Sequence, residues 1–160
     1  MEELTAQDIM TRKVVTITKD FTIRDLSKLL LSNKISGAPV VDEKGKLLGM
    51  VTDADIITED ISPIFSYHIV PLLMSYGIIE NIEQYQKDIR LYLETTVEKI
   101  MTRKVKSVKM DTPVSEVAKI MVRNNINRIP VVDNDNNLIG IIARDNVIES
   151  MVKDAEKQQE

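Results

Sequence analysis

The sequence contains an internal repeat, and this repeat constrains the fold more than any other feature. The run Ile-Met-Thr-Arg-Lys-Val at positions 9–14 returns letter for letter at positions 100–105. With the same offset and without a gap, Pro-Val-Val-Asp at 39–42 falls on the same four residues at 130–133. Similarity at a fixed offset is typical of a duplicated structural unit. The chain is therefore expected to fold as two copies of one small motif.

Each copy predicts three short strands. Runs rich in β-branched residues at 14–17 and 105–108 predict the first strand of each copy. The other two strands of each copy are joined by a turn rich in Asp and Asn or Gly. These four strands are predicted at 38–41, 46–52, 129–132 and 138–143.

Two helices per copy complete the predicted motif. The first helix begins at Thr22 in one copy and at Thr112, followed by Pro113, in the other. The last helix begins near Asp53 and near Asp145. The repeated unit is therefore β-α-β-β-α, an α/β (α+β) architecture. Because one such unit is too small to bury a core, the two should pack about a pseudo-two-fold axis, with a cleft between them.

The segment between the copies is too long for a simple linker, and it carries all four tyrosines. Ser62-Pro63 predicts the start of one helix, and a second helix presents Tyr85, Ile89 and Tyr92 on one face. This face either covers the module's own sheet or forms a dimer or partner surface. The predicted domains are a first motif at 1–61, a helical insertion at 62–97, a second motif at 98–152 and a charged tail at 153–160.

Composition excludes several classes of function. The chain has 160 residues, and no run approaches the ~20 apolar residues that cross a bilayer. The absence of cysteine excludes disulfides, a thiolate nucleophile and a Cys-based zinc site. A net charge of -4 argues against general affinity for nucleic acid. The first residues lack the pattern of a secretion signal, so the protein is expected in the cytoplasm and not in a membrane.

No pattern in the sequence predicts catalysis or a metal site. The single histidine, His68, lies among apolar residues and is interpreted as a packed or partly exposed helix residue. Asp53 and Asp55 form a carboxylate pair, but no nucleophile or metal-ligand spacing accompanies them. The five glycines form neither a P-loop nor a dinucleotide fingerprint. We therefore do not expect an enzyme, and no cofactor should be required.

Residues in both copies resemble the CBS family. The resemblance rests on the start Ile-Met-Thr of each copy, on Ala-Pro-Val-Val-Asp at 38–42 and on Gly-Met-Val-Thr-Asp-Ala-Asp at 49–55. It implies a regulatory CBS pair, or Bateman module, that binds AMP, ADP, ATP or S-adenosylmethionine between its two motifs. It also implies a homodimer that acts on an effector protein. The alternative is a structural dimerisation or protein-interaction module without a physiological ligand.

The resemblance implies one complete ligand site. In the family, a Thr and an Asp three residues later at the start of the last helix contact phosphate and ribose, and Thr52 and Asp55 match this pattern. Ser36 matches a phosphate-contacting position. A plain helix N-cap is the alternative interpretation of Thr52 and Asp55. The adenine would be lined from the other copy by Thr102, Lys106 and Ile126.

A second, pseudo-symmetric site departs from the family pattern. Ala143 replaces the Thr, and Asn146 replaces the Asp. We expect this site to be weaker, selective for another ligand, or empty. Its other implied members are an adenine wall and two phosphate-binding side chains, namely Thr11, Val15 and Ile35 for the wall and Asn127 and Arg128 for the phosphate.

Overall fold

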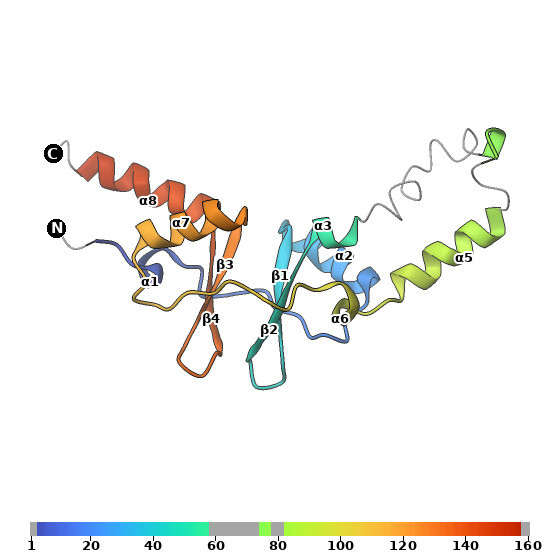
Figure 1. Ribbon diagram of the computed structural model, residues 1–160, viewed down its shortest axis with the longest axis horizontal. Helices are drawn as coiled ribbons and strands as arrows, with labels where there is room; N and C mark the ends of the chain where they lie inside the picture. Colours follow the sequence, from blue (N-terminus) through green and yellow to red (C-terminus); the bar gives the residue numbers. More distant parts are fainter. Residues whose placement is uncertain (1–2, 58–73, 78–81, 158–160) are drawn as a thin grey trace. The chain divides into compact units, whose positions relative to one another are not determined.

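A computed structural model of the protein describes residues 3–57, 74–77 and 82–157 (Figure 1). Its helices are α1 (Ala6–Ile9), α2 (Ile23–Asn33), α3 (Asp53–Ile56), α5 (Ile82–Leu93), α6 (Val97–Ile100), α7 (Val114–Asn124) and α8 (Arg144–Lys157). Its strands are β1 (Gly37–Val41), β2 (Leu47–Thr52), β3 (Arg128–Val132) and β4 (Leu138–Ala143). They form two-stranded sheets, β1-β2 and β3-β4. The mixed architecture and these four predicted strands are confirmed, with strand ends within about one residue.

The first strand predicted in each copy is wrong. Residues 14–16 and 105–107 have no regular secondary structure. Only the last residue of each run, Ile17 and Val108, forms an isolated bridge. Val108 bridges Val131 in β3 in parallel, with Val108 N–H donating to Pro130 O (3.0 Å) and Val132 N–H donating to Val108 O (2.9 Å). A β-branched run does not by itself create a ladder, because strand preference depends on the neighbours that are available for pairing.

The predicted start of the first helix in each copy is correct to within one residue. Asp25 N–H donates to Thr22 Oγ1 (3.1 Å), so Thr22 caps α2 as predicted. The cap of α7 is Pro113, one residue later than predicted. Thr112 Oγ1 instead accepts a hydrogen bond from the Lys109 backbone (3.0 Å), which orders the turn before the helix.

The described chain divides into two compact units, and each unit combines parts of both copies. The first unit contains Met1–Thr16, Pro39–Gly49 and Arg103–Glu160. The second unit contains Ile17–Ala38 and Met50–Thr102. The leading segment of each copy therefore joins the following part of the other copy.

Backbone hydrogen bonds fix this exchange at equivalent positions. In the first unit, Ala6 N–H at the start of α1 donates to Thr112 O (2.8 Å), just before α7. In the second unit, Val97 N–H at the start of α6 donates to Phe21 O (2.7 Å), just before α2. Each unit is therefore built from segments of both copies.

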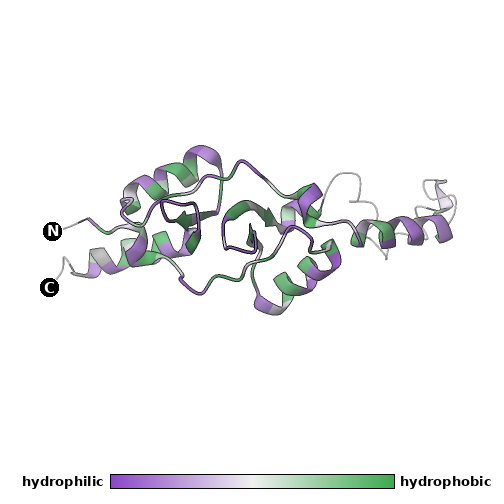
Figure 2. Cartoon of the chain, turned by 90° about the horizontal axis from the view of Figure 1, so that it is seen from below, coloured by the Kyte–Doolittle hydropathy of each residue, from purple (hydrophilic) through white to green (hydrophobic). Residues whose placement is uncertain are grey.

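The core of the first unit lies between its sheet and its helices. Ile129 in β3 and Ile142 in β4 are paired across the antiparallel ladder, and both are fully buried. Figure 1 shows α7 and α8 beside these strands, and Figure 2 shows that the longer helices are apolar on one side and polar on the other. The buried members of this core are Ala6, Met10, Val108, Val114, Val117, Met121, Ile129, Val131, Ile142 and Val147.

The second unit contains the described part of the helical insertion. Tyr85 on α5 is buried, and Ile89 and Tyr92 are half-buried. Gly77 has a φ of +69°, as expected where a helix breaks. The helix predicted from Ser62-Pro63 and the single histidine, His68, lie outside the described residues. No helix in the described ranges is long and apolar enough to cross a membrane.

Candidate functional site

The start of α3 positions the two central candidate residues, Thr52 and Asp55. Thr52 ends β2 and is the N-cap of α3. Asp55 Oδ2 accepts two hydrogen bonds from it, one from the Thr52 backbone N–H (2.7 Å) and one from the Thr52 hydroxyl (2.9 Å). Within the described part of the chain, Asp55 Oδ1 has no hydrogen-bond partner. Both residues are half-buried, so this oxygen belongs to a carboxylate held in one orientation close to solvent.

Backbone hydrogen bonds connect Ser36 and Thr102 to the residues at and just before the start of α3. Asp53 N–H, at the first position of α3, donates to Ser36 O (2.9 Å). Thr102 and Met50 exchange two backbone hydrogen bonds (2.9 and 3.0 Å), and Met50 lies two residues before Thr52 in β2. The second unit therefore combines four candidate residues, of which Thr102 comes from the second copy.

The other two predicted members of this site, Lys106 and Ile126, belong to the first unit. Lys106 is exposed on the irregular segment before Val108. Ile126 follows α7, where its N–H donates to Met121 O (3.0 Å), and its half-buried side chain packs against the core. Contact of either residue with an adenine ring stays a prediction.

The N-cap interpretation of Thr52 and Asp55 agrees with the observed hydrogen bonds. The same arrangement recurs at α1, where Asp8 Oδ2 accepts from the Thr5 N–H (2.8 Å) and the Thr5 hydroxyl (2.7 Å). The hydrogen bond from the Thr5 hydroxyl, followed by that from its backbone, lowers the pKa of Asp8. Capping and ligand binding are compatible at Asp55, because the cap uses only one of its two carboxylate oxygens.

The pseudo-symmetric site at the start of α8 has the same backbone hydrogen bonds as the first site, but it has Asn146 in place of the Asp55 carboxylate. Thr11 and Ile141 exchange two backbone hydrogen bonds (2.9 and 3.0 Å), as Thr102 and Met50 do. Asn146 Oδ1 accepts from Ala143 N–H (2.8 Å), so the amide keeps the backbone part of the cap. The hydroxyl bond is absent because Ala143 has no hydroxyl. The Asn146 amide presents an N–H donor where the other copy presents a carboxylate oxygen.

The remaining predicted members of the second site lie on different parts of the fold. Asn127 precedes β3, and its carbonyl accepts from Arg144 N–H (3.0 Å) at the start of α8. Arg128 is half-buried at the first position of β3, and Val15 is half-buried in the irregular leading segment. Ile35 follows α2 in the second unit and is half-buried. Four predicted members of this site, Thr11, Val15, Asn127 and Arg128, therefore share the first unit with Asn146, whereas Ile35 lies in the second unit.

The sequence analysis missed Tyr92 as a neighbour of the site. Its hydroxyl donates a hydrogen bond to the Ile56 carbonyl (2.8 Å) at the last residue of α3. Burial raises the pKa of Tyr92, and the negative charge of Asp55 raises it further. The available signal was that a tyrosine on a packed helix stripe needs a hydrogen-bond partner for its hydroxyl.

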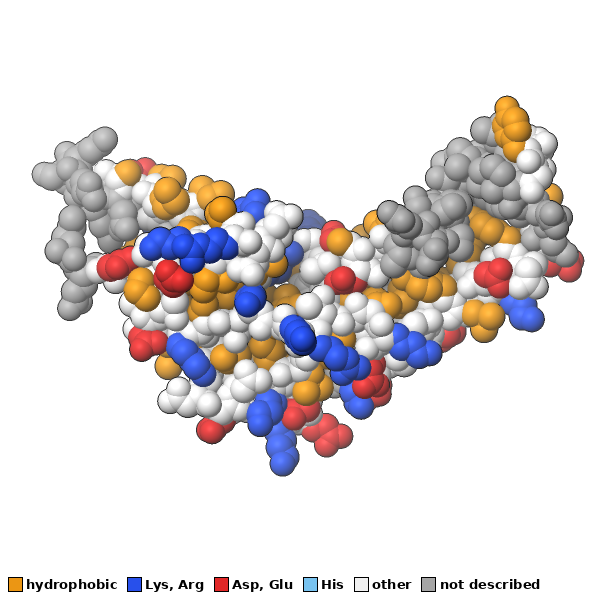
Figure 3. Space-filling view, viewed as in Figure 1, with side chains coloured by type: hydrophobic (Ala, Val, Ile, Leu, Met, Phe, Trp, Pro, Cys, Tyr) orange, Lys and Arg blue, Asp and Glu red, His pale blue; other side chains and the backbone are white. Residues whose placement is uncertain are grey.

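The described residues offer no metal site. They contain no group of three His, Cys, Asp or Glu side chains that could hold a metal ion. Figure 3 shows Lys and Arg side chains spread over the face in view, with acidic side chains among them.

Comparisons with known proteins agree with this arrangement. The family model described as CBS domain matches residues 6–62 and 97–153. Protein MJ1426 of Methanocaldococcus jannaschii is 37% identical over 157 residues, which cover 94% of this chain and 93% of that protein. Two further curated relatives are much longer, and the chain spans only 43% and 22% of their lengths.

Two solved structures of similar size have ligands named with them. The CBS domain pair of protein MJ0100, in complex with 5′-methylthioadenosine and S-adenosyl-L-methionine, has a TM-score of 0.69 and 25% identity, and the match covers 96% of this chain and 99% of that one. CBSX2 of Arabidopsis thaliana, in complex with AMP, has a TM-score of 0.69 and 26% identity, with coverage of 93% and 96%.

Proposed function

Because the chain belongs to the CBS domain family, we propose that it is a regulatory module that senses an adenosine-containing ligand. The ligand class comprises AMP, ADP, ATP and S-adenosylmethionine. The observation that carries the proposal is the held carboxylate of Asp55, which has one oxygen available beside Thr52, Ser36 and Thr102. The similar CBS pairs described with AMP and with S-adenosyl-L-methionine support the same ligand class.

The ribose is proposed to bind Asp55. A carboxylate oxygen is a strong acceptor for the ribose hydroxyls, and Asp55 Oδ1 can accept from them while Oδ2 keeps its bond to Thr52 N–H. The phosphate is proposed to bind near Thr52 and Ser36. Phosphate oxygens only accept hydrogen bonds, so the Thr52 hydroxyl must turn its hydrogen from Asp55 toward the phosphate. Ligand binding therefore exchanges one internal hydrogen bond for an intermolecular one.

The adenine is proposed to contact the second copy through Thr102, Lys106 and Ile126. A ligand held in this way contacts residues from both copies, since Thr102 of the second copy shares a unit with Asp55 of the first. Its binding would favour one arrangement of the pair over another, because a ligand shifts a conformational equilibrium only through different interactions in the two states. An effector protein or a second copy of the chain would respond to that shift.

We also propose that the module is a homodimer. Equivalent positions on the first helix of each copy carry strongly exposed aliphatic side chains, Leu31 on α2 (80% exposed) and Val122 on α7 (77%). Closed two-fold dimers are the commonest oligomers and would cover such positions. Light scattering over a concentration series should give twice the chain mass for wild type and a lower mass for the Leu31→Lys, Val122→Lys double variant. One chain mass for wild type at all concentrations refutes the dimer.

A thermal-shift panel tests the proposed ligand class. Wild type is heated with AMP, ADP, ATP, S-adenosylmethionine or NAD, and with inorganic phosphate as the control for unspecific anion effects. A specific ligand stabilises the folded state by RT ln(1 + [L]/Kd), or about 2.7 kcal/mol at a hundredfold excess over Kd. At least one adenosine compound should raise the Tm while phosphate does not. No rise with any of them favours the alternative, a structural interaction module without a ligand.

A further inference from the structure

Helix α3, which carries Asp55, is too short to be stable by itself. It contains four residues, Asp53–Ile56, and helices of this length do not form in isolation. At its start it is held by the Thr52 and Asp55 hydrogen bonds described above. At its end, Ile57 N–H donates to Asp53 O at 3.2 Å, and the Ile56 carbonyl accepts from the Tyr92 hydroxyl at 2.8 Å. Tyr92 therefore supplies a side-chain contact at the end of the helix.

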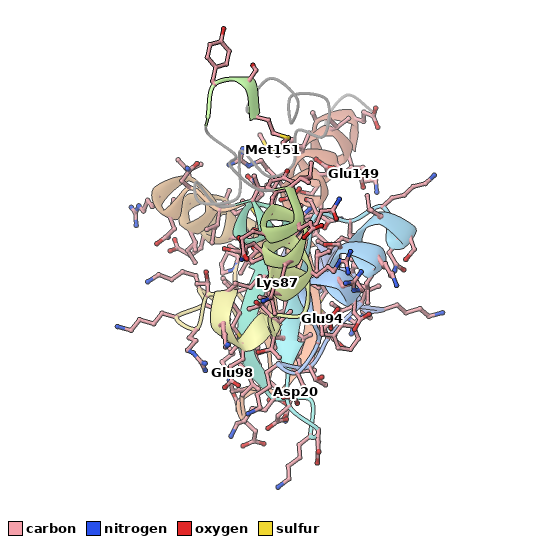
Figure 4. All side chains as sticks on the ribbon, turned by 90° about the vertical axis from the view of Figure 1, so that its right-hand side faces the viewer. Asp20, Lys87, Glu94, Glu98, Glu149 and Met151 are labelled. Atoms are coloured by element: carbon pink, nitrogen blue, oxygen red, sulfur yellow. The ribbon has the colours of Figure 1, made fainter. Side chains whose placement is uncertain are left out.

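The end of α5 that carries Tyr92 is itself anchored. Arg24 Nε on α2 donates a hydrogen bond to Glu94 Oε1 (2.9 Å), and Arg24 Nη2 forms an ion pair with the same oxygen (2.9 Å). One residue later, Thr95 O accepts from Ile23 N–H (2.9 Å) at the start of α2. Figure 4 labels Lys87 and Glu94, which mark the course of α5 down to this anchored end. The Tyr92 ring thus approaches α3 from a fixed backbone.

The negative charge of Asp55 also affects the ionisation of Tyr92. Its hydroxyl bonds the carbonyl of the residue that follows Asp55, and the Asp55 carboxylate raises the pKa of Tyr92 in addition to the larger effect of burial. The neutral phenol is therefore the form that fits beside the ionised carboxylate. A phenylalanine at this position would keep the ring and lose only the hydrogen bond.

We propose that Tyr92 is a positioning residue through which the helical insertion holds α3, and with it the Asp55 carboxylate, in the geometry that binds the ligand. This inference rests on the proposed function and adds the insertion to it. The insertion then regulates the site, because any change that moves the end of α5 alters the orientation of Asp55. By reciprocity, a ligand bound at Asp55 stabilises the same end of α5.

The test compares Tyr92→Phe with Tyr76→Phe, a matched control whose ring is 74% exposed. Isothermal titration calorimetry with AMP, or with the compound that gives the largest thermal shift, measures the affinity of each variant. Loss of one hydrogen bond that orders α3 should weaken binding by about three- to tenfold in Tyr92→Phe, with no change in Tyr76→Phe. The double variant Asp55→Ala, Tyr92→Phe should bind no more weakly than Asp55→Ala alone, because Tyr92 acts through α3 and Asp55.

A second measurement needs no ligand and also serves if Tyr92→Phe does not fold. Ultraviolet titration of the tyrosines in Asp55→Asn should show a lower pKa for Tyr92 than in wild type, because the nearby negative charge is gone. An unchanged pKa overturns the proposed link between the two side chains. Wild-type affinity in Tyr92→Phe, or strictly additive losses in the double variant, overturns the positioning role and leaves nucleotide binding intact. A wild type that binds none of the probes refutes both proposals.

Discussion

Replacing Asp55 with Ala should separate its role as a helix cap from its role in binding a ligand. As a cap, Asp55 accepts the Thr52 N–H at 2.7 Å and the Thr52 hydroxyl at 2.9 Å. Loss of such a cap costs about 0.5 to 2 kcal/mol of unfolding free energy. As a ligand contact, the carboxylate would accept charge-assisted hydrogen bonds from a ribose, and their loss costs about 1.5 to 3 kcal/mol of binding free energy. This corresponds to about 10- to 150-fold weaker binding.

The chain offers a matched control for the capping effect. Thr22 and Asp25 form the same Thr-x-x-Asp pattern at the start of α2, with a Thr22 hydroxyl to Asp25 Oδ2 distance of 2.9 Å. Asp25 accepts only the hydroxyl bond and not the backbone N–H, so Asp25→Ala should lower the unfolding free energy by less than Asp55→Ala and leave affinity within about twofold of wild type. Asp55→Asn should keep most of the stability, because Asn146 already makes the corresponding backbone bond at 2.8 Å.

Calorimetry with the strongest ligand of the panel measures affinity, and urea denaturation of the same samples measures stability. We expect the order of affinity to be wild type and Asp25→Ala, then Asp55→Asn, then Asp55→Ala. If both Asp55→Ala and Asp25→Ala lose stability and neither loses affinity, Asp55 is a helix cap only, and the proposed ribose contact is refuted.

Three further predictions concern the second site, the packing beside the first site and the hairpin turn. The double change Ala143→Thr, Asn146→Asp should strengthen binding of a second nucleotide by about tenfold or more. Two equal, tight sites in wild-type calorimetry would show that Ala143 and Asn146 do not weaken the second site. Gly37→Ala should lower the unfolding free energy by about 1 to 3 kcal/mol in urea denaturation, because the new Cβ would lie 2.9 Å from a backbone carbonyl oxygen; unchanged stability would contradict this packing. The hydrogen bond from the Asn137 side chain, followed by that from its backbone, lowers the pKa of Asp133, so this bond stabilises the fold above the ordinary pKa of 3.8 and is lost as the pH falls through the lowered value. Carbon-detected NMR titration should find a higher Asp133 pKa in Asn137→Ala, and an identical pKa would exclude the contact.

Local features of the fold could be predicted from the sequence because they depend on near neighbours. The cap at Thr22 requires only an Asp three residues later, and the strands around each hairpin require only short apolar runs joined by a turn. The strand predicted at 105–108 failed because its pairing is decided elsewhere in the chain, where Val131 accepts it at one point only. Local preference and long-range pairing are different physical quantities, and only the first can be read from a short run.

In the candidate site, too, local contacts could be predicted from the sequence and long-range contacts could not. The bonds between Thr52 and Asp55 follow from their spacing at a helix start. The pairing of Thr102 with Met50 and the contact of Tyr92 with Ile56 join residues far apart in the sequence. The repeat indicated that both copies would contribute to a site, but not that their leading segments are exchanged. Tyr92 was assigned to an apolar stripe because periodicity describes the ring and ignores the hydroxyl.

NMR titration of the 15N-labelled wild-type chain with AMP, ATP and S-adenosylmethionine tests the central claim most directly. The amides of Thr52, Asp55 and Thr102 should shift and saturate with at least one of these ligands. The amides at the equivalent helix start of Asp25, which has the same capping pattern, should stay in place. Shifts of equal size at both helix starts, or no saturable shift at Thr52 and Asp55 with any of the three ligands, would contradict the account.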